Sequence, residues 1–276
     1  MAIILDGKAV AAKHKALIKK TVDSMTHTPG LALVLVGDDP ASHVYVKHKI
    51  KDCDECGFAA FPHYLPASTT QDELLALIAL LNANSAVNGI LLQHPVPKHI
   101  DFEAVINAID PCKDVDCFHP ENIGRYMTGQ PRFLPCTPAG VMLLLDEYGI
   151  DAAGKECVVV GRSNIVGKPQ SMLLLQKHGT VTLCHSRTPD LGEVTRRADI
   201  LVAAVGVLHL IKPDMVKPGA VVIDVGMNTK TDGKLAGDVD FDAVEKIASH
   251  ITPVPGGVGP MTRVMLMKQV LASVEG

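Results

Sequence analysis

The sequence predicts an α/β protein with two lobes, each built on a parallel β-sheet that helices cover on both faces. Several short segments, such as 31–36 and 87–92, are apolar at almost every position. They alternate with segments whose apolar residues recur at helical spacing. Strands that are apolar on both faces are typical of buried parallel sheets. A second strand-turn-helix unit around residues 158–178 begins a second series of the same kind.

The first lobe is expected to alternate three strands with four helices. Gly57 follows the second of these helices and is suited to end it, and Thr69 or Thr70 is expected to cap the third, with Glu73 placed for a capping box. The strands are expected at 31–36, 58–65 and 87–92, and the helices at 7–27, 40–56, 70–82 and 101–109.

The segment 110–136 is rich in Pro, Gly, Cys and Asp and only weakly periodic, so we expect it to cross between the lobes. The first domain is therefore predicted to comprise 1–136 and 257–276, and the second 137–256. In the second domain and beyond it, a helix is expected at 137–148, strands near 157–160, 180–184, 199–205 and 220–225, and a last helix at 263–274.

Composition limits the classes of function. The chain has 276 residues, 47% of them apolar, which is enough for two domains with sizeable cores. Its net charge of −4 and the absence of a long basic run argue against nucleic acid and anionic membrane as partners. An odd number of cysteines, 7, without a signal peptide indicates a reducing, cytoplasmic location. The 12 histidines show no zinc-type spacing, so no metal site is expected.

The stretch from Val158 to Pro169 indicates a dinucleotide-binding unit. Three valines run into Gly161, and a short loop leads to Pro169, which suits the first turn of a helix. Gly179 is expected to take the left-handed position after that helix. The helix N-terminus would then face a pyrophosphate. Ser163 and Val166 replace two glycines of the usual G-x-G-x-x-G motif, so an ordinary α/β turn stays open as an alternative.

The residues after the next strand favour NADP over NAD. NAD enzymes usually place an acid there for the ribose 2′-hydroxyl, but this chain has His185, Ser186 and Arg187. Together with Arg162, two guanidinium groups and a hydroxyl are available for a 2′-phosphate. Each arginine alone could equally be a solvated surface residue.

Chemistry-bearing side chains also gather in the first lobe. Ser42, Tyr45 and Lys49 share one face of the expected helix at 40–56, whose N-terminal end lies at the carboxyl edge of the sheet. Gln93 ends the strand at 87–92 and is placed at the same edge. A surface lysine and a loop amide bonded to backbone are the plain alternatives.

Three further features are less specific. Asp114 and Asp116 follow a proline-containing turn, and we expect one to cap it and the other to accept hydrogen bonds from a ligand. The motif PGGVGP at 255–260 would let backbone approach a ligand closely, or would serve as a rigid turn. Cys53 and Cys56 form C-x-x-C, but at a helix C-terminus, where the dipole disfavours a thiolate.

Four motifs together resemble one enzyme family. ASHVYVKHK, ILLQHP with KDVD, PCTPAG with VVVGRSNIVGKP, and ITPVPGGVGPMT occur in the order and spacing of the bifunctional methylenetetrahydrofolate dehydrogenase/cyclohydrolase (FolD) family, over essentially the whole chain. The resemblance implies a cleft between a catalytic domain and a Rossmann-type NADP domain, and a homodimer formed through the NADP domains. It implies NADP-dependent oxidation of 5,10-methylenetetrahydrofolate, and hydrolysis of the methenyl product to 10-formyltetrahydrofolate, in one-carbon metabolism.

The same resemblance assigns roles to residues. It implies a catalytic Lys49 with Tyr45 as its partner and Gln93 as its support. Substrate-binding positions are Ser42, Tyr45, Lys49, Leu92, Gln93, Asp116, Pro255, Gly256 and Gly257. Cofactor-binding positions are Thr137, Gly161, Arg162, Ser163, Ile165, Ser186, Arg187 and Met227. The chain departs from the family pattern at His94, Val96 and Cys117, which flank substrate positions.

Two other functions remain open on the sequence alone. One is a different two-lobe NADP dehydrogenase of the shikimate type. The other is a nucleotide-sensing module without turnover, although such a module has no need for Lys49, Tyr45 and Gln93 together.

Overall fold

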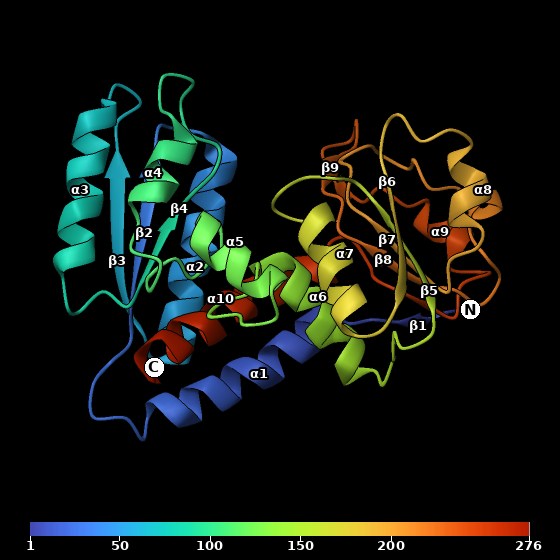
Figure 1. Ribbon diagram of the computed structural model, residues 1–276, viewed down its shortest axis with the longest axis horizontal. Helices are drawn as coiled ribbons and strands as arrows, with labels where there is room; N and C mark the ends of the chain where they lie inside the picture. The colour runs from blue at the N-terminus through green and yellow to red at the C-terminus, as the bar shows by residue number, and fades with distance from the viewer. Residues whose placement is uncertain (276) are drawn as a thin grey trace. The chain divides into compact units, whose positions relative to one another are not determined.

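The computed structural model describes residues 1–275, and the chain divides into two compact units (Figure 1). Unit 1 comprises residues 1–11 and 137–262, and unit 2 comprises residues 12–136 and the chain from 263 onward. This division differs from the expected domain boundaries at both ends of unit 1. Residues 1–11 belong to unit 1 because β1 (Ile3–Ile4) pairs in parallel with β11 (His250–Ile251).

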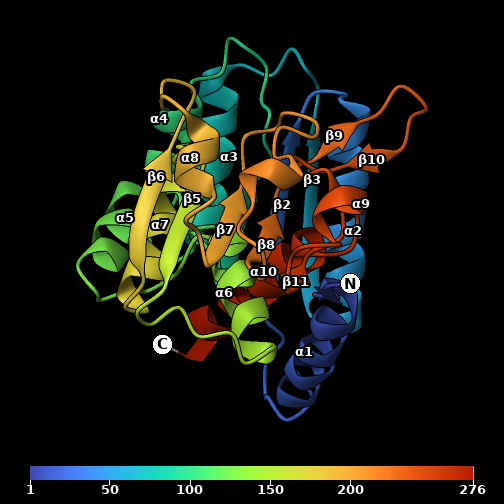
Figure 2. The ribbon, with the colours of Figure 1, turned by 90° about the vertical axis from the view of Figure 1, so that its right-hand side faces the viewer.

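Unit 1 contains a six-stranded sheet in the order β1-β11-β8-β7-β5-β6, and every pairing in it is parallel. Figure 2 shows β6, β5, β7 and β8 side by side. The central strands are buried at nearly every residue because helices and loops cover both faces. Their bounds are Glu156–Val160 for β5, Thr180–Cys184 for β6, Ile200–Ala203 for β7 and Val221–Asp224 for β8.

Short elements surround this sheet. Helix α7 (Gly167–Gln176) packs against β5 and β6. The other elements of unit 1 are α8 (Leu191–Thr195), the 3₁₀ turn η1 (Pro213–Met215), α9 (Phe241–Val244), and the antiparallel pair β9 (Asn228–Thr229) and β10 (Leu235–Ala236). Helix α6 (Cys136–Glu147) opens the unit's second segment.

Unit 2 contains a three-stranded parallel sheet in the order β3-β2-β4. Strand β2 (Gly30–Val36) is fully buried between β3 (Ala59–Leu65) and β4 (Gly89–Leu92). Helix α2 (Pro40–Cys56) packs against β2 and β3, and α3 (Gln71–Ala83) packs against α4 (Phe102–Ala108). Helix α5 (Pro120–Met127) completes the unit, and α1 (Gly7–Val22) and α10 (Val258–Glu275) each begin in unit 1 and continue into unit 2.

The α/β class, the parallel sheets and several helix ends are confirmed. Gly57 ends α2 in the left-handed conformation at φ 79°, because a residue without Cβ adopts it at little cost. Thr70 and Glu73 form the reciprocal bonds of a capping box at the start of α3.

Two expectations about local structure are wrong, and one segment holds a helix that was not expected. His178, not Gly179, takes the left-handed conformation after α7, at φ 63°. Gly179 is instead required by packing, since a Cβ there would lie 2.9 Å from Cys157 Sγ. The segment 110–136 lies within unit 2 and contains α5, a helix that its weak periodicity did not indicate. Helix α10 begins at Val258, inside the PGGVGP motif, not at Arg263.

Candidate active site

Lys49 and Gln93 lie together in unit 2. Lys49 Nζ donates a hydrogen bond to Gln93 Oε1 at 2.8 Å, and Gln93 Nε2 donates to the carbonyl of His94 at 2.8 Å. Lys49 comes from α2 and Gln93 from the residue after β4, so the two meet at the carboxyl end of a parallel strand. Gln93 is buried, and its amide is held by main chain on one side and by the ammonium on the other. The alternative of a solvated surface lysine does not apply to this arrangement.

Asp116 supplies the countercharge to Lys49. Burial lowers the pKa of the Lys49 ammonium, and the Asp116 carboxylate opposes that shift. Burial likewise raises the pKa of Asp116, while Lys49 and a hydrogen bond with Cys136 favour its charged form. The two groups are therefore a partly desolvated pair whose proton affinities have moved toward each other.

A second charge cluster lies one turn along α2. Asp52 is buried and forms ion pairs with Lys15 Nζ at 2.9 Å and with Arg263 Nη1 at 3.0 Å. Asp52 also favours the charged form of Lys49, and Arg263 disfavours it. This cluster was missed from the sequence, although the spacing of Lys49 and Asp52 on one helix was a readable signal.

Gln269 of α10 fixes the main chain around Asp116. Its Nε2 donates to the carbonyls of Val115 at 2.6 Å and Leu134 at 2.7 Å, and its Oε1 accepts from Leu134 N at 2.6 Å. Val115 immediately precedes Asp116, so this buried amide holds the acid's backbone. No pattern in the sequence singled it out.

Asp114 has a different environment from Asp116. Its carboxylate accepts hydrogen bonds from Phe118 N, His119 N and Asn122 Nδ2, at 3.1, 2.8 and 2.9 Å. Burial raises its pKa to about 6, against these hydrogen bonds. The side chain that caps the turn is thus Asp114.

The other predicted substrate positions of unit 2 are more separate. Ser42 is buried, and its hydroxyl donates to Asp39 Oδ2 at 2.7 Å, where it helps to cap α2. Tyr45 is 38% exposed on the same helix, and burial of the rest raises its pKa. Leu92 is buried at the end of β4.

The carboxyl edge of the unit 1 sheet is shaped by glycines. Gly161 has φ 125°, and a Cβ there would lie 2.2 Å from the carbonyl oxygen of Ala204. A Cβ on Gly167 would lie 1.9 Å from the carbonyl oxygen of Gly161. The absence of a side chain at both positions lets the loop after β5 fold tightly over the start of α7. Such a tight loop leaves the N-terminus of the helix accessible to a dinucleotide pyrophosphate.

The predicted cofactor residues fall along this edge. Ser163 stands where the usual motif has a glycine. Its Oγ accepts hydrogen bonds from Val166 N and Gly167 N at 3.2 and 3.3 Å, and these bonds hold the loop closed. The other residues of these loops are exposed: Arg162 and Ile165 after β5, Ser186 and Arg187 after β6, and Met227 after β8. Strands β5 and β6 are paired neighbours, so their two arginine-bearing loops begin side by side.

The remaining predicted positions also lie in unit 1. Thr137 and Thr262 share a hydrogen bond of 3.0 Å between their hydroxyls. Pro255 follows a cis peptide bond, and the carbonyl of Gly256 accepts from Lys8 N at 3.1 Å. A Cβ on Gly7 would lie 1.8 Å from the carbonyl oxygen of Gly257, so the start of α1 packs tightly on this loop.

The redox and metal alternatives gain no support. Burial raises the pKa of both Cys53 and Cys56 to about 12, which keeps them as inert thiols. Within residues 1–275 no group of His, Cys, Asp and Glu has the geometry to hold a metal ion.

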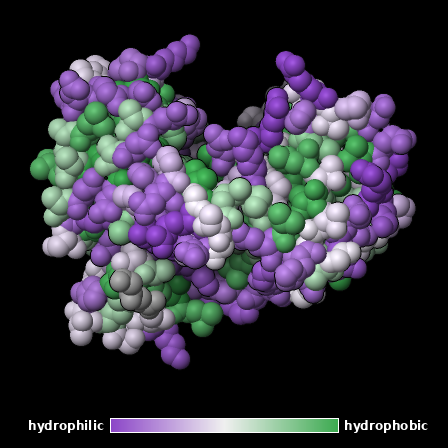
Figure 3. All heavy atoms as spheres, in the orientation of Figure 1, coloured by the Kyte–Doolittle hydropathy of each residue, from purple (hydrophilic) through white to green (hydrophobic). Residues whose placement is uncertain are grey.

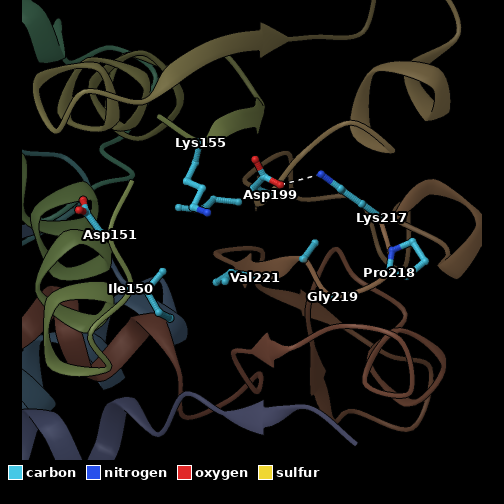
Figure 4. Close-up of a pocket in the computed structure, with 10 residues that line it drawn as sticks. Ile150, Asp151, Lys155, Asp199, Lys217, Pro218, Gly219 and Val221 are labelled. Atoms are coloured by element: carbon cyan, nitrogen blue, oxygen red, sulfur yellow. Dashed lines mark hydrogen bonds and ion pairs between the residues drawn. The ribbon is translucent and has the colours of Figure 1, made fainter. Parts of the chain in front are cut away.

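A hollow in unit 1 lies at the opposite edge of the sheet from the cofactor loops. Figure 4 shows Lys155, Asp199, Lys217, Gly219 and Val221 around it. These residues precede or begin β5, β7 and β8, and are thus at the amino ends of the strands. Ligands of open α/β sheets bind at the carboxyl ends, so we do not assign this hollow to the active site.

Comparison with known proteins identifies the family. Residues 5–116 match the family Tetrahydrofolate dehydrogenase/cyclohydrolase, catalytic domain, and residues 135–276 match the corresponding NAD(P)-binding domain. The Bifunctional protein FolD of Ruminiclostridium cellulolyticum is 59% identical over 98% of this chain and 96% of its own. The FolD structure from Campylobacter jejuni matches with a TM-score of 0.97 and 48% identity, over 100% of this chain and 99% of that one.

A third relative shows the cofactor. The N5,N10-methylenetetrahydrofolate dehydrogenase-cyclohydrolase of Trypanosoma brucei, solved with NADP and an inhibitor, matches with a TM-score of 0.95 and 39% identity, over 99% of this chain and 97% of that one. By contrast, the shikimate 5-dehydrogenase of Listeria monocytogenes has a TM-score of 0.53 and 13% identity, a likeness of fold alone. The shikimate-type and sensor alternatives are therefore not favoured. The chain belongs to the tetrahydrofolate dehydrogenase/cyclohydrolase family and is a bifunctional, NADP-using methylenetetrahydrofolate dehydrogenase and methenyltetrahydrofolate cyclohydrolase.

Proposed function

We propose that Lys49, supported by Gln93 and Asp116, carries out the hydrolysis of 5,10-methenyltetrahydrofolate in unit 2. The observation that supports this most directly is the 2.8 Å hydrogen bond between Lys49 Nζ and Gln93 Oε1, together with the electrostatic influence of the partly buried Asp116 carboxylate on the lysine. Hydrolysis adds water to a cationic carbon and removes a proton from that water. The ring nitrogen then takes up a proton as its bond to carbon breaks, and the remaining hydroxyl proton is released as the formyl carbonyl forms. A lysine with a lowered pKa can serve as both base and acid in this sequence.

Gln93 is proposed to orient the lysine. Its oxygen accepts from the ammonium while its nitrogen is bound to the His94 carbonyl, so the amide cannot rotate without losing one of the two bonds. The lysine is thereby held in one direction, which removes part of the entropic cost of bringing it to the reacting carbon. Tyr45 is the proposed partner of Lys49 on the same helix.

Asp116 is proposed to bind the pterin. The amino-pyrimidine edge of the pterin presents two N–H donors, and a carboxylate can accept hydrogen bonds from both of them. Gln269 holds the main chain next to this acid in place. We propose Ser42 and Leu92 as further walls of the folate site in unit 2. In unit 1, Pro255, Gly256 and Gly257 are proposed substrate-binding positions.

Unit 1 is proposed to bind NADP along the carboxyl edge of its sheet. When bound, the cofactor accepts a hydride from the folate. The close approach of main chain at Gly161 and Gly167 fits a pyrophosphate at the start of α7. The proposed ligands of the 2′-phosphate are Arg162, Ser186 and Arg187, and the remaining proposed contacts are Thr137, Ser163, Ile165 and Met227.

We propose that the chain forms a homodimer through unit 1. Strand β6 is an edge of the six-stranded sheet, and an open edge is a ready site for pairing with another chain. Leu175 of α7 and Leu183 of β6 are 50% and 37% exposed, and Figure 3 shows hydrophobic residues in the region where α7 and β6 lie in Figure 1.

A location in the cytoplasm is part of the same proposal. Among residues 1–275 no helix is at once long enough and apolar enough to cross a membrane. The 7 cysteines, all free, are suited to a reducing compartment.

Two assays on the purified chain test these assignments. The first follows NADPH formation from methylenetetrahydrofolate and NADP, and the second follows decay of added methenyltetrahydrofolate above its spontaneous hydrolysis. We expect the chain to accelerate both reactions above their rates without enzyme. A Gln93→Ala variant should lose more cyclohydrolase activity than dehydrogenase activity. Equal small effects on both would remove Gln93 from the proposed machinery. Sedimentation at several concentrations tests the dimer, and a purely monomeric species would contradict it.

A further inference from the structure

Two buried carboxylates of unit 1, Asp224 and Asp238, have no part in the functions assigned so far. Asp238 is 0% exposed and Asp224 is 3% exposed. Asp224 ends β8, and Asp238 follows the β9–β10 pair. Two acids are costly to bury unless their oxygens are satisfied, so their hydrogen bonds indicate what they do.

Asp238 is bound by donors from two loops at the carboxyl edge of the sheet. Its Oδ2 accepts from Val205 N at 2.7 Å and Gly206 N at 3.1 Å. Its Oδ1 accepts from Val207 N at 2.9 Å and from Asn228 Nδ2 at 2.9 Å. Residues 205–207 follow β7, and Asn228 follows β8. One side chain thus ties together the loops of two neighbouring strands.

Asp224 holds the main chain on which this link depends. Its Oδ1 accepts from Gly226 N and Asp238 N, both at 2.9 Å, and its Oδ2 accepts from Val239 N at 2.8 Å. Burial raises the pKa of Asp224 to about 7, and the three backbone donors oppose that shift. The position of the Asp238 backbone is therefore set by Asp224.

Glycines make room for both acids. A Cβ on Gly226 would lie 2.2 Å from Asp238 Oδ1, and a Cβ on Gly237 would lie 1.8 Å from Asp224 Oδ2. The main chain passes so close to the carboxylates that no other residue fits at either position. The arrangement is rigid, because neither of the main-chain segments bound by Asp224 and Asp238 can move away without breaking several hydrogen bonds.

Met227 lies between the two segments that are held. Gly226 is bound by Asp224, and Asn228 is bound by Asp238. Met227 is one of the residues proposed above to contact NADP, and the loop 205–207 belongs to the same edge of the sheet. We infer that Asp238, supported by Asp224, is a positioning residue for NADP: it fixes the loops after β7 and β8 in the binding geometry without touching the cofactor. This inference rests on the proposed binding of NADP at this edge.

Asp238→Asn tests the inference with little change of shape. Each carboxylate oxygen of Asp238 accepts hydrogen bonds from two N–H donors. In the variant an amide NH2 replaces one of these oxygens and cannot accept them, so two of the four hydrogen bonds are lost. We expect the KM and the dissociation constant for NADP to rise roughly 10- to 100-fold. Cyclohydrolase activity on added methenyltetrahydrofolate, which needs no NADP, should be unchanged. Calorimetric titration with NADP measures the binding without turnover.

Asp199→Asn is the matched control. Asp199 lies at the amino edge of the same sheet, where its carboxylate accepts from Lys217 Nζ at 2.7 Å and from Glu156 N at 3.0 Å (Figure 4). It also accepts a backbone N–H in the same unit, but at the end of the strands away from the loops after β7 and β8. We expect this variant to bind NADP as the unaltered chain does.

Each outcome decides the question. An unchanged affinity for NADP in Asp238→Asn, or equal losses of cyclohydrolase and dehydrogenase activity in a folded variant, would overturn the positioning role. If Asp238→Asn does not fold, Asn228→Ala removes one of the four donors, and a selective rise in the NADP dissociation constant is still expected, whereas no change would count against the inference. If the proposed cofactor assignment itself is wrong, the calorimetric titration of the unaltered chain will show no binding of NADP. That result is distinct from a failure of the positioning role.

Discussion

The two sheet edges that carry the proposed sites are built in different ways. In unit 1 the edge is shaped by main chain: Gly161 and Gly167 allow close approach, and the buried Asp224 and Asp238 accept hydrogen bonds mainly from backbone N–H groups. The side chains proposed to meet the phosphate, Arg162, Ser186 and Arg187, are exposed. In unit 2 the edge carries partly buried charges, Lys49 and Asp116, whose pKa values burial has shifted. The first arrangement suits recognition of a large anion, and the second suits proton transfer in a low dielectric. Changes to one edge should therefore separate the two reactions.

The largest expected effect comes from removing the acid of unit 2. Asp116→Ala removes a carboxylate proposed to accept two hydrogen bonds from the pterin, each contributing about 1.5–3 kcal/mol. Both reactions should lose roughly 10²- to 10⁴-fold in kcat/KM, since both use the same folate site. Steady-state assays of the two activities measure this loss. A variant that lost only one activity would show that Asp116 does not bind the shared substrate.

A smaller and more selective effect is expected at the edge of unit 1. Arg162→Ala should lower kcat/KM with NADP by roughly 10- to 100-fold, the equivalent of one charge-assisted hydrogen bond. Its rate with NAD and its cyclohydrolase rate should change little. Kinetics with both cofactors test the assignment, and equal losses with NADP and NAD would refute a contact with the 2′-phosphate.

Asp114 sharpens the comparison within unit 2, because it is buried near Asp116 but holds a turn. Its folded pKa of about 6 lies above the unfolded value of 3.8, so the folded state binds the proton more tightly. This contribution to stability is present below pH ~4 and is lost as the pH rises through ~6, by about 2–3 kcal/mol. Asp114→Asn should remove this decline.

The measurement is the free energy of unfolding in denaturant on either side of that pH range. Asp72→Asn, on the exposed face of α3, serves as the control and should follow the unaltered chain. A decline of the same size in Asp114→Asn would assign the titration to another group.

The smallest effect concerns a turn that belongs to neither site. His178 is exposed at φ 63°, a conformation that costs a residue with a Cβ roughly 1–2 kcal/mol relative to glycine. His178→Gly should stabilise the chain by about 0.5–1 kcal/mol, after the greater entropy of glycine in the unfolded state is subtracted. Thermal unfolding beside His178→Ala tests this, and a glycine variant less stable than the alanine variant would contradict it. Neither activity should change.

Local signals in the sequence predicted much of the fold. Continuous apolar runs predicted the parallel strands, and a threonine at 69 or 70 with Glu73 predicted a capping box, because both signals depend on neighbours in the chain. The structure shows that Thr70 is the cap. The left-handed residue after α7 was misassigned because packing against Cys157, which is distant in sequence, decides the role of Gly179. Helix α5 was missed because it is short and lies among turn residues.

The sequence predicted the residues of the candidate site that are proposed to act on the substrate, but not the buried residues that hold the surrounding main chain. Lys49 and Gln93 were placed at one sheet edge from the order of strand and helix, and the structure joins them. Asp238 and Gln269 act through hydrogen bonds to main chain that is distant in sequence, and such partners leave no periodic or local pattern. Cys117 stands at φ 60°, a left-handed conformation that only the backbone geometry reveals.

The central claim is that the charge of Lys49 serves hydrolysis, whereas hydride transfer requires alignment. Lys49→Met keeps the length of the side chain and the helix propensity and removes the ammonium. The decisive measurement pairs NADPH formation with decay of added methenyltetrahydrofolate in this one variant. We predict a cyclohydrolase loss of roughly 10²- to 10⁴-fold, with substantial dehydrogenase activity and accumulation of the methenyl compound. Full cyclohydrolase activity in a folded Lys49→Met chain would contradict the account.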